Sequence, residues 1–265
     1  MTMHADQLHV DSHIVRELVD VQFPQRRGLP ISELNATGTV NAIFRIGDDL
    51  AARFPLVGQD PTQTRKSLEA EAAAARELAT AVAVPTPQPV ALGEPGAGYP
   101  LPWSVQTWLV GDDATVEDPA GSDGFAYDLA ELIGDMRAYD TCGRRFGGVG
   151  RGGHLADHDE WLETCFRQSE DLLEVPLLRR IWGNLRSLAE VDADVMCHGD
   201  LIPPNLLVDD GRLVGVLDGG GFGPADPALD LVAAWHLLDA PRRLILRHEL
   251  GCSDVQWQRG MAWAF

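Results

Sequence analysis

Cysteine, positive charge and long hydrophobic runs are all scarce in this sequence, and each shortage excludes a class of protein. The 265 residues include four cysteines, which form neither a CxxC pair nor a His/Cys cluster at zinc-ligand spacing. We therefore expect reduced thiols, with no disulfide framework and no structural zinc site.

Lys and Arg together number 21 against 40 Asp and Glu, which gives a formal net charge of −19. A surface of this sign repels phosphate backbones and anionic lipid headgroups, so neither nucleic acid nor a membrane is expected as the main partner. A cationic ligand would be attracted. No segment reaches the length of a membrane span, and the first residues contain no export signal, so we expect a cytoplasmic protein.

The rest of the composition is typical of an ordinary globular protein. Hydrophobic residues make up 45% of the chain and charged residues 23%. A chain of this length can bury a sizeable core in one large domain or two small ones.

The first part of the chain predicts a small sheet with helices. Asp11 or Ser12 can cap a helix that ends before Pro24, and an Ala- and Glu-rich helix over residues 65–80 is stopped by a proline-rich run at 85–89. Strand-like runs lie at residues 33–34, 42–46, 50–54 and 104–109. We place a boundary near residue 110, which divides the chain into an N-terminal lobe of residues 1–110 and a C-terminal lobe of residues 111–265.

The second part is predicted to be mainly helical. Helical patterns cover residues 125–139, 157–173, 176–190 and the chain from 226 onward. The glycine-rich residues 143–153 are expected to form a loop.

A hairpin organises the polar residues that carry the chemistry. Residues 206–208 and 212–217 are apolar, β-prone runs on either side of Asp210-Gly211, a strong hairpin-turn signal. Antiparallel pairing about this turn returns Asn205 and Asp218 to the same end of the hairpin. Asp200 lies on the loop that enters that end.

Two carboxylates and a carboxamide at one end of a hairpin suit a magnesium nucleotide. Mg²⁺ prefers oxygen ligands and usually takes only one or two from the protein, which fits Asn205 and Asp218. Asp200, kept off the metal, could accept the proton of an attacking hydroxyl and align it with a γ-phosphate. The arrangement therefore predicts phosphoryl transfer.

His198-Gly199-Asp200, followed by Asn205 and Asp218, resembles the catalytic loop and metal-binding Asp of the aminoglycoside phosphotransferase family, small-molecule kinases related to protein kinases. The resemblance covers most of the chain. It implies an α+β, two-lobed, protein-kinase-like fold with a small antiparallel-sheet N-lobe and a mainly helical C-lobe. It also implies that Asp200 is the catalytic base or hydroxyl-orienting group and that Asn205 and Asp218 bind Mg²⁺.

For the nucleotide, the resemblance implies that Arg53 contacts the α- and β-phosphates and pairs with Glu71. Gly38, at the centre of residues 35–41, would belong to the loop that covers the phosphates. The expected cofactors are ATP and Mg²⁺, with GTP left open. The hinge that would offer backbone groups to adenine consists of Gln106, Thr107, Trp108 and Leu109.

One feature separates the chain from protein kinases, and two depart from the pattern of the aminoglycoside phosphotransferase family. Gly199 stands where protein kinases have Arg, so no phosphorylated activation loop can be anchored there and constitutive activity is expected. Gly219-Gly220-Gly221 follows Asp218, which predicts a mobile loop near the metal. Family members usually carry further helix beyond the point where this sequence stops, so we expect part of the substrate wall to be absent.

Structural roles are the alternative for several of these residues. His198 is interpreted as a hydrogen-bonding residue without a role in proton transfer, and Asp226, ahead of a proline, as a helix cap. Asp230 either holds the catalytic loop from a buried position or faces the site. Arg53 and Glu71 could also be ordinary surface charges.

The sequence thus predicts a kinase that phosphorylates a hydroxyl of a small molecule, with an aminoglycoside antibiotic as the leading acceptor. A macrolide or a metabolite alcohol is the alternative acceptor. A nucleotide-binding homologue without transferase activity is an alternative of another class, and a protein kinase is a weaker one. The acceptor, the position phosphorylated and the oligomeric state are left open.

Overall fold

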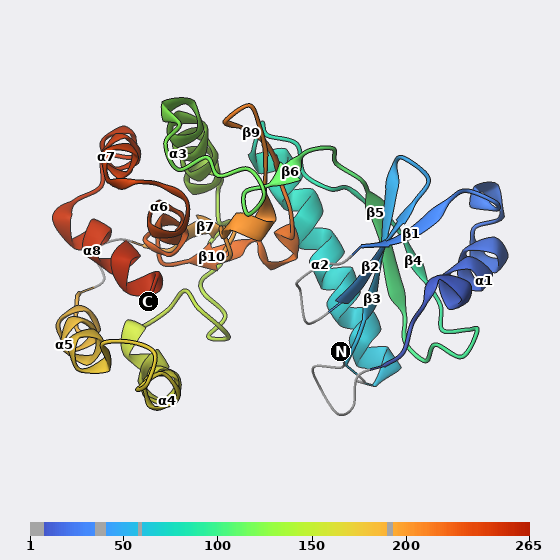
Figure 1. Ribbon diagram of the computed structural model, residues 1–265, viewed down its shortest axis with the longest axis horizontal. Coiled ribbons are helices and arrows are strands. Elements are labelled where there is room, and N and C mark those ends of the chain that lie inside the picture. Colours follow the sequence, from blue (N-terminus) through green and yellow to red (C-terminus); the bar gives the residue numbers. More distant parts are fainter. Residues whose placement is uncertain (1–7, 35–40, 58–59, 190–192) are drawn as a thin grey trace. The chain divides into compact units, whose positions relative to one another are not determined.

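The computed structural model describes residues 8–34, 41–57, 60–189 and 193–265 (Figure 1). The chain divides into two compact units, one of Met1–Ala79 with Thr86–Val110 and the other of Thr80–Pro85 with Gly111–Phe265. The short segment Thr80–Pro85 belongs to the second unit, where the Pro85 carbonyl accepts a hydrogen bond from the Val216 amide at 2.9 Å.

The first unit is built on a five-stranded antiparallel sheet with the strand order β1-β2-β3-β5-β4. Because side chains alternate between the two faces of a strand, Phe54 faces one side of the sheet and its neighbour Arg53 the other. The strands are β1 (Ile31–Leu34), β2 (Asn41–Ile46), β3 (Leu50–Pro55), β4 (Pro89–Gly93) and β5 (Trp103–Thr107).

Helix α1 (Ser12–Gln22) covers the Phe54 face. The Asp11 carboxylate accepts the backbone amides of His13 and Ile14 and so caps the helix. The apolar face of α1 packs against a core in which Phe54 stacks on Trp103 with ring centroids 4.8 Å apart. Helix α2 (Pro61–Ala81) runs along the opposite side of the strands in Figure 1 and buries Leu68 and Leu78.

The second unit is mainly helical and contains two small sheets. One sheet pairs β7 (Val195–Cys197) with β10 (Gly223–Ala225), and the other has the order β6-β8-β9, with β6 (Asp112–Asp113), β8 (Leu206–Asp209) and β9 (Arg212–Val216). The helices are α3 (Asp123–Ala138), α4 (Asp159–Gln168), α5 (Val175–Leu185), α6 (Val232–Leu237), α7 (Ala240–Glu249) and α8 (Asp254–Trp263).

A buried ion pair ties α8 to the segment that follows β10. Arg259, 2% exposed, donates from Nε to Asp226 Oδ2 at 3.0 Å, and Trp263 Nε1 donates to the same oxygen at 2.8 Å. The other carboxylate oxygen, Oδ1, accepts the Ala228 amide at 2.9 Å within a turn. The helix cap predicted for Asp226 is wrong, because the 3₁₀ helix that follows, Leu229–Leu231, begins after Ala228 and has no side-chain cap. Asp226 instead anchors the C-terminal helix, a role that its sequence position did not indicate.

The opening helix, the three-strand meander and the hairpin after Asn205 are confirmed, as is the loop over residues 143–153. The helix expected before the proline-rich run is also confirmed, because α2 ends at Ala81. Strand β4, which begins at Pro89, was not predicted; it lies at the sheet edge, where a proline costs little hydrogen bonding. One expected helix was too long. The helix expected over residues 157–173 is the shorter α4, preceded by a 3₁₀ turn. Within the described ranges, no helix combines the length and apolar character needed to cross a membrane.

Candidate functional site

The β8–β9 hairpin brings Asn205 and Asp218 to its own open end. Asp210 and Gly211 both have positive φ, 49° and 68°, as a tight two-residue hairpin turn requires. Leu206 lies opposite Val216 in the register, and the Leu217 amide donates to the Asn205 carbonyl at 2.8 Å. The chain therefore places the residues just before β8 and just after β9 side by side, as the sequence predicted.

Asn205 is bonded directly to Asp200. Its Nδ2 donates to Asp200 Oδ2 and to the Asp200 carbonyl, both at 2.9 Å. With Nδ2 directed at Asp200, the amide oxygen Oδ1 is left as the acceptor end of the Asn205 side chain. The Asn205 carboxamide thus holds Asp200 through Nδ2, while its Oδ1 can accept a hydrogen bond or bind a metal ion.

The loop that carries Asp200 is fastened by Asp230. The two carboxylate oxygens of Asp230 accept the backbone amides of His198, at 2.8 Å, and Gly199, at 2.9 Å. Asp230 is only 2% exposed, and this burial raises its pKa above the ordinary value, against the opposing effects of His198, the two amides and Arg137. Of the two roles considered for Asp230, the structure shows the first, a buried anchor of the catalytic loop.

His198 connects the catalytic loop to the end of the hairpin. Its Nε2 lies 2.9 Å from the Leu217 carbonyl, and its Nδ1 lies 3.3 Å from the Asp200 amide. These contacts fit a ring that donates from Nε2 and accepts at Nδ1. His198 is buried, so the structural role predicted for it is confirmed, and it also links the residue before Asp218 to Asp200.

Asp218 follows immediately after Leu217 in a left-handed backbone conformation, with φ 58° and ψ 39°. Asp tolerates this region better than most residues, and the next three glycines form a 3₁₀ turn. The residues present suit a magnesium ion, because the Asn205 carboxamide and the Asp218 carboxylate are hard oxygen donors. No group of three or more His, Cys, Asp or Glu able to hold a metal occurs among the described residues, so Mg²⁺ here would need nucleotide phosphates and water as its other ligands.

Arg151 contacts the predicted base and was not among the predicted site residues. Its Nη2 donates to Asp200 Oδ1 at 2.8 Å and to the Gly199 carbonyl at 3.1 Å. The only signal in the sequence was an arginine within a run of glycines in the loop before α4.

The nucleotide-binding residues predicted in the first unit lie on the sheet and on α2. Arg53 is on β3, opposite Ser104 of β5, and Glu71 is on α2; both are partly buried. Their mutual pairing stays a prediction. Gly38 lies outside the described residues.

The predicted hinge begins at the end of β5. Two of its backbone amides are already bonded within the unit: Thr107 donates to the Gln88 carbonyl at 2.9 Å and Trp108 to the Asp49 carbonyl at 2.8 Å. An adenine base would therefore have to use the carbonyls of this segment or the amide of Leu109. Gln106 lies within β5, opposite Ala51.

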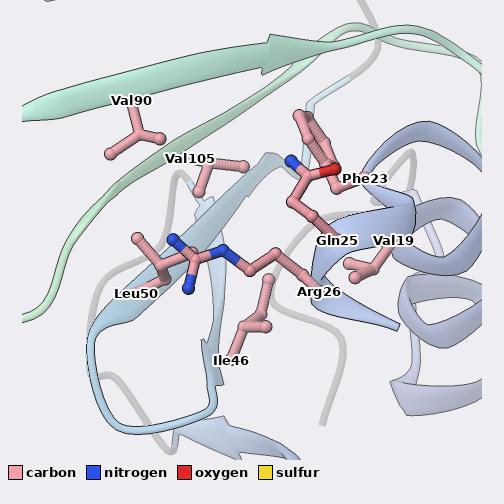
Figure 2. Close-up of a pocket in the computed structure, with 8 residues that line it drawn as sticks. All are labelled: Val19, Phe23, Gln25, Arg26, Ile46, Leu50, Val90 and Val105. Atoms are coloured by element: carbon pink, nitrogen blue, oxygen red, sulfur yellow. The ribbon is translucent and has the colours of Figure 1, made fainter. Parts of the chain in front are cut away.

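A cavity of about 260 Å³ lies between α1 and the sheet (Figure 2). It is lined by apolar side chains with Gln25 and Arg26 beside them, and Arg26 Nη1 forms an ion pair with Asp49 at 3.1 Å. Because Ile46, Leu50 and Val105 belong to the core packed under α1, the cavity is on the sheet face opposite Arg53. It is therefore not part of the predicted nucleotide site.

A family model described as "Phosphotransferase enzyme family" matches residues 33–262. The chain belongs to this family. Membership confirms the resemblance carried by the His198-Gly199-Asp200 motif and identifies the chain as a phosphotransferase-family protein.

Related proteins agree with this assignment. The chain is 40% identical over 73 residues to an aminoglycoside 3'-phosphotransferase of Streptomyces fradiae, a match that covers 24% of this chain and 27% of that protein. The chain thus spans about a quarter of the length of the curated phosphotransferases it matches.

Solved structures show the fold. The GDP and kanamycin complex of the aminoglycoside phosphotransferase APH(2")-IIIa superposes with a TM-score of 0.71 at 21% identity, over 96% of this chain and 88% of that one. The macrolide 2'-phosphotransferase of Brachybacterium faecium superposes with a TM-score of 0.63 at 18% identity, over 93% and 88%. The predicted α+β, two-lobed kinase-like fold is confirmed.

Proposed function

We propose that this protein transfers the γ-phosphoryl group of a nucleoside triphosphate to a hydroxyl of a small molecule, with an aminoglycoside as the acceptor. The observation that carries the proposal is the bond from Asn205 Nδ2 to Asp200 Oδ2, at the end of the hairpin where Asp218 follows. In the proposed roles, Asp200 is the base, and Asn205 and Asp218, at the open end of the hairpin, are the oxygen donors for the metal.

Asp200 is suited to the role of base. Its side chain is 46% exposed, so an acceptor hydroxyl can reach it. The loop that carries it is fixed by the buried Asp230, which accepts two backbone amides of that loop. Asp200 would accept the hydroxyl proton as the acceptor oxygen forms a bond to the γ-phosphorus. The bond from that phosphorus to the β–γ bridging oxygen breaks, and a nucleoside diphosphate leaves.

The nucleotide would be bound with Mg²⁺ held by Asn205 Oδ1 and Asp218, and with Arg53 on the phosphates. The metal supplies charge neutralisation on the phosphate oxygens. ATP is the proposed donor and GTP the alternative, since related structures contain GDP in one case and ATP in another.

Two observations support an aminoglycoside acceptor. The net charge of −19 favours encounter with a polycation, and the curated relatives at 36–40% identity over short matches are aminoglycoside 3'-phosphotransferases. Solved macrolide phosphotransferases share the fold, so macrolides belong in the same test.

The proposal is tested with γ-labelled ATP or GTP, Mg²⁺ and a panel of aminoglycosides, macrolides and simple alcohols. We expect label on an aminoglycoside, and we expect Asp200→Asn to reduce the rate by about 10³-fold or more, within the range seen when a catalytic group is removed. Asp209→Asn, which changes an exposed carboxylate on β8, is the matched control and should leave the rate unchanged.

Other results would point to the alternatives. Nucleotide binding without label on any acceptor would indicate a binding protein without transferase activity. Label on macrolides alone would indicate that the acceptor is a macrolide and not an aminoglycoside. Label on an added protein substrate would indicate a protein kinase.

A further inference from the structure

Both carboxylate oxygens of Asp200 are engaged by other side chains. Asn205 Nδ2 holds Oδ2 at 2.9 Å, and Arg151 Nη2 holds Oδ1 at 2.8 Å. A carboxylate that is hydrogen-bonded at both oxygens cannot rotate about the Cβ–Cγ bond without breaking one of these contacts. We propose that Arg151 is a positioning residue that fixes the carboxylate of Asp200 for the attacking hydroxyl; this inference rests on the proposed function.

The loop that carries Arg151 is built to present it. Gly152 is buried with φ 125°, and a Cβ added there would come within 2.7 Å of the Ala225 Cβ, so only glycine fits this approach. The Gly152 carbonyl accepts the Asp226 amide at 2.8 Å. Because Asp226 is itself held by Arg259 and Trp263 of α8, the residue next to Arg151 is tied to the core of the unit.

One feature separates this contact from an ordinary surface ion pair. Arg151 also donates to the Gly199 carbonyl, so it bonds the loop backbone as well as the side chain of the base. Its side chain is 37% exposed and that of Asp200 46%, and ion pairs at this exposure add little to stability. The arrangement is therefore poorly explained by stability alone.

The way Arg151 binds leaves much of its guanidinium available. Both of its hydrogen bonds come from Nη2, and across the described ranges neither Nε nor Nη1 donates to a protein acceptor. A guanidinium can bind an oxygen-rich group on one edge while the other edge is engaged. Arg151 can thus stay on Asp200 while an acceptor hydroxyl approaches.

His236 lies in the electrostatic field of both residues. Burial lowers its pKa, the positive charge of Arg151 lowers it further, and Asp200 acts in the opposite direction. Histidine with a lowered pKa is mostly uncharged at neutral pH. Arg151 therefore supplies the permanent positive charge in this group of three.

The test measures labelled transfer by Arg151→Ala. We expect kcat to fall by roughly 10- to 100-fold, the scale of a misplaced catalytic group, with KM for the nucleotide unchanged. Added guanidinium or ethylguanidinium should restore part of the lost kcat, because it can re-form the bond to Asp200; a purely structural role would show no such rescue. Arg145→Ala, an exposed arginine in the same loop, is the matched control and should behave as wild type.

A second variant tests the contact between Arg151 and Asp200 by changing the backbone next to Arg151. Gly152→Ala forces the loop away from Ala225 and should lower kcat as Arg151→Ala does, because the shifted loop moves the guanidinium of Arg151 away from Asp200. Thermal unfolding of each variant confirms that the fold is retained.

The outcomes separate the inference from the proposed function. A wild-type chain that transfers phosphate to no acceptor overturns both. Wild-type transfer with an undiminished kcat in Arg151→Ala, or a loss that guanidinium does not rescue, overturns the role of Arg151 alone.

Discussion

Asp230 shows how one buried residue can define a site without touching substrate. Its two oxygens accept two consecutive amides, those of His198 and Gly199, so the backbone that carries Asp200 has a fixed direction. Gly199 has φ 85°, a conformation open to glycine, which lets the chain turn directly after the histidine. The position of Asp200 is therefore set by the two residues before it, His198 and Gly199, and by Asp230, 30 positions further along the chain.

Asp230→Asn should lower both stability and activity. Asparagine offers one acceptor oxygen and an NH₂ group, so one of the two amides would face a donor in a buried place, at a cost of about 1–3 kcal/mol. Displacement of the loop should lower kcat by roughly 10- to 100-fold. Chemical denaturation and labelled transfer measure the two effects, with Asp209→Asn as the control. Wild-type values of both quantities in Asp230→Asn would contradict the anchoring role.

The residues of the motif could be predicted from the sequence, as could the structural role of His198 and, as one of two alternatives, the anchoring role of Asp230; Arg151 could not. The spacing of Asp200, Asn205 and Asp218 follows from a loop and a hairpin, both of which are local in the chain. Arg151 reaches Asp200 from a distant segment, and its contacts depend on how that segment packs. Local spacing holds no information about such packing.

At the scale of elements, helix α3 supports the hairpin on which the site depends. The Asp128 carboxylate accepts Arg212 Nε at 2.7 Å and the Leu213 amide at 3.1 Å, which joins α3 to the start of β9. The hydrogen bond from Arg212 is the largest of the effects that lower the pKa of Asp128. The hairpin is thus fastened at its turn end by α3 and at its open end by the catalytic loop.

This contact predicts a pH-dependent contribution to stability. Because the pKa of Asp128 is lower in the folded state, the contribution is present above the ordinary value of 3.8 and is lost as the pH falls through the folded value. Asp128→Asn should reduce the free energy of unfolding by about 1 kcal/mol at pH 7, a small figure because Arg212 is largely exposed. The difference from wild type should shrink as the pH is lowered below 4.

Urea unfolding at a series of pH values measures this difference. Glu131→Gln is the control, since Glu131 acts on Arg212 through space and not through a hydrogen bond. A stability loss in Asp128→Asn that stays constant from pH 7 to pH 3 would contradict the ionic origin of the contact.

Elements with local signals were predicted well, and those that depend on distant partners were not. Asp11 and its amide bonds mark the start of α1, and Asp210-Gly211 marks the hairpin turn. Strands β7 and β10 are three residues each and exist because they pair with one another across the second unit. Strand β4 was hidden because prolines normally indicate a break.

At the scale of the whole molecule, the chain has two compact units, and the residues with predicted roles divide between them. Arg53, Glu71 and the hinge belong to the first unit, whereas Asp200, Asn205 and Asp218 belong to the second. The kinase-like fold and the family followed from one motif and the order of elements around it. The acceptor did not, because it is chosen by side chains whose places depend on tertiary packing.

The central claim is that positions 200, 205 and 218 serve one metal–nucleotide site. The most direct measurement is a crystal structure with Mn²⁺ in place of Mg²⁺ and a non-hydrolysable nucleoside triphosphate, in which the metal is located by its anomalous scattering. We expect a peak about 2.1–2.2 Å from Asn205 Oδ1 and from an Asp218 carboxylate oxygen, with Asp200 outside the coordination sphere. A peak bound by other residues, or one that includes Asp200 and leaves out Asn205 and Asp218, would contradict it.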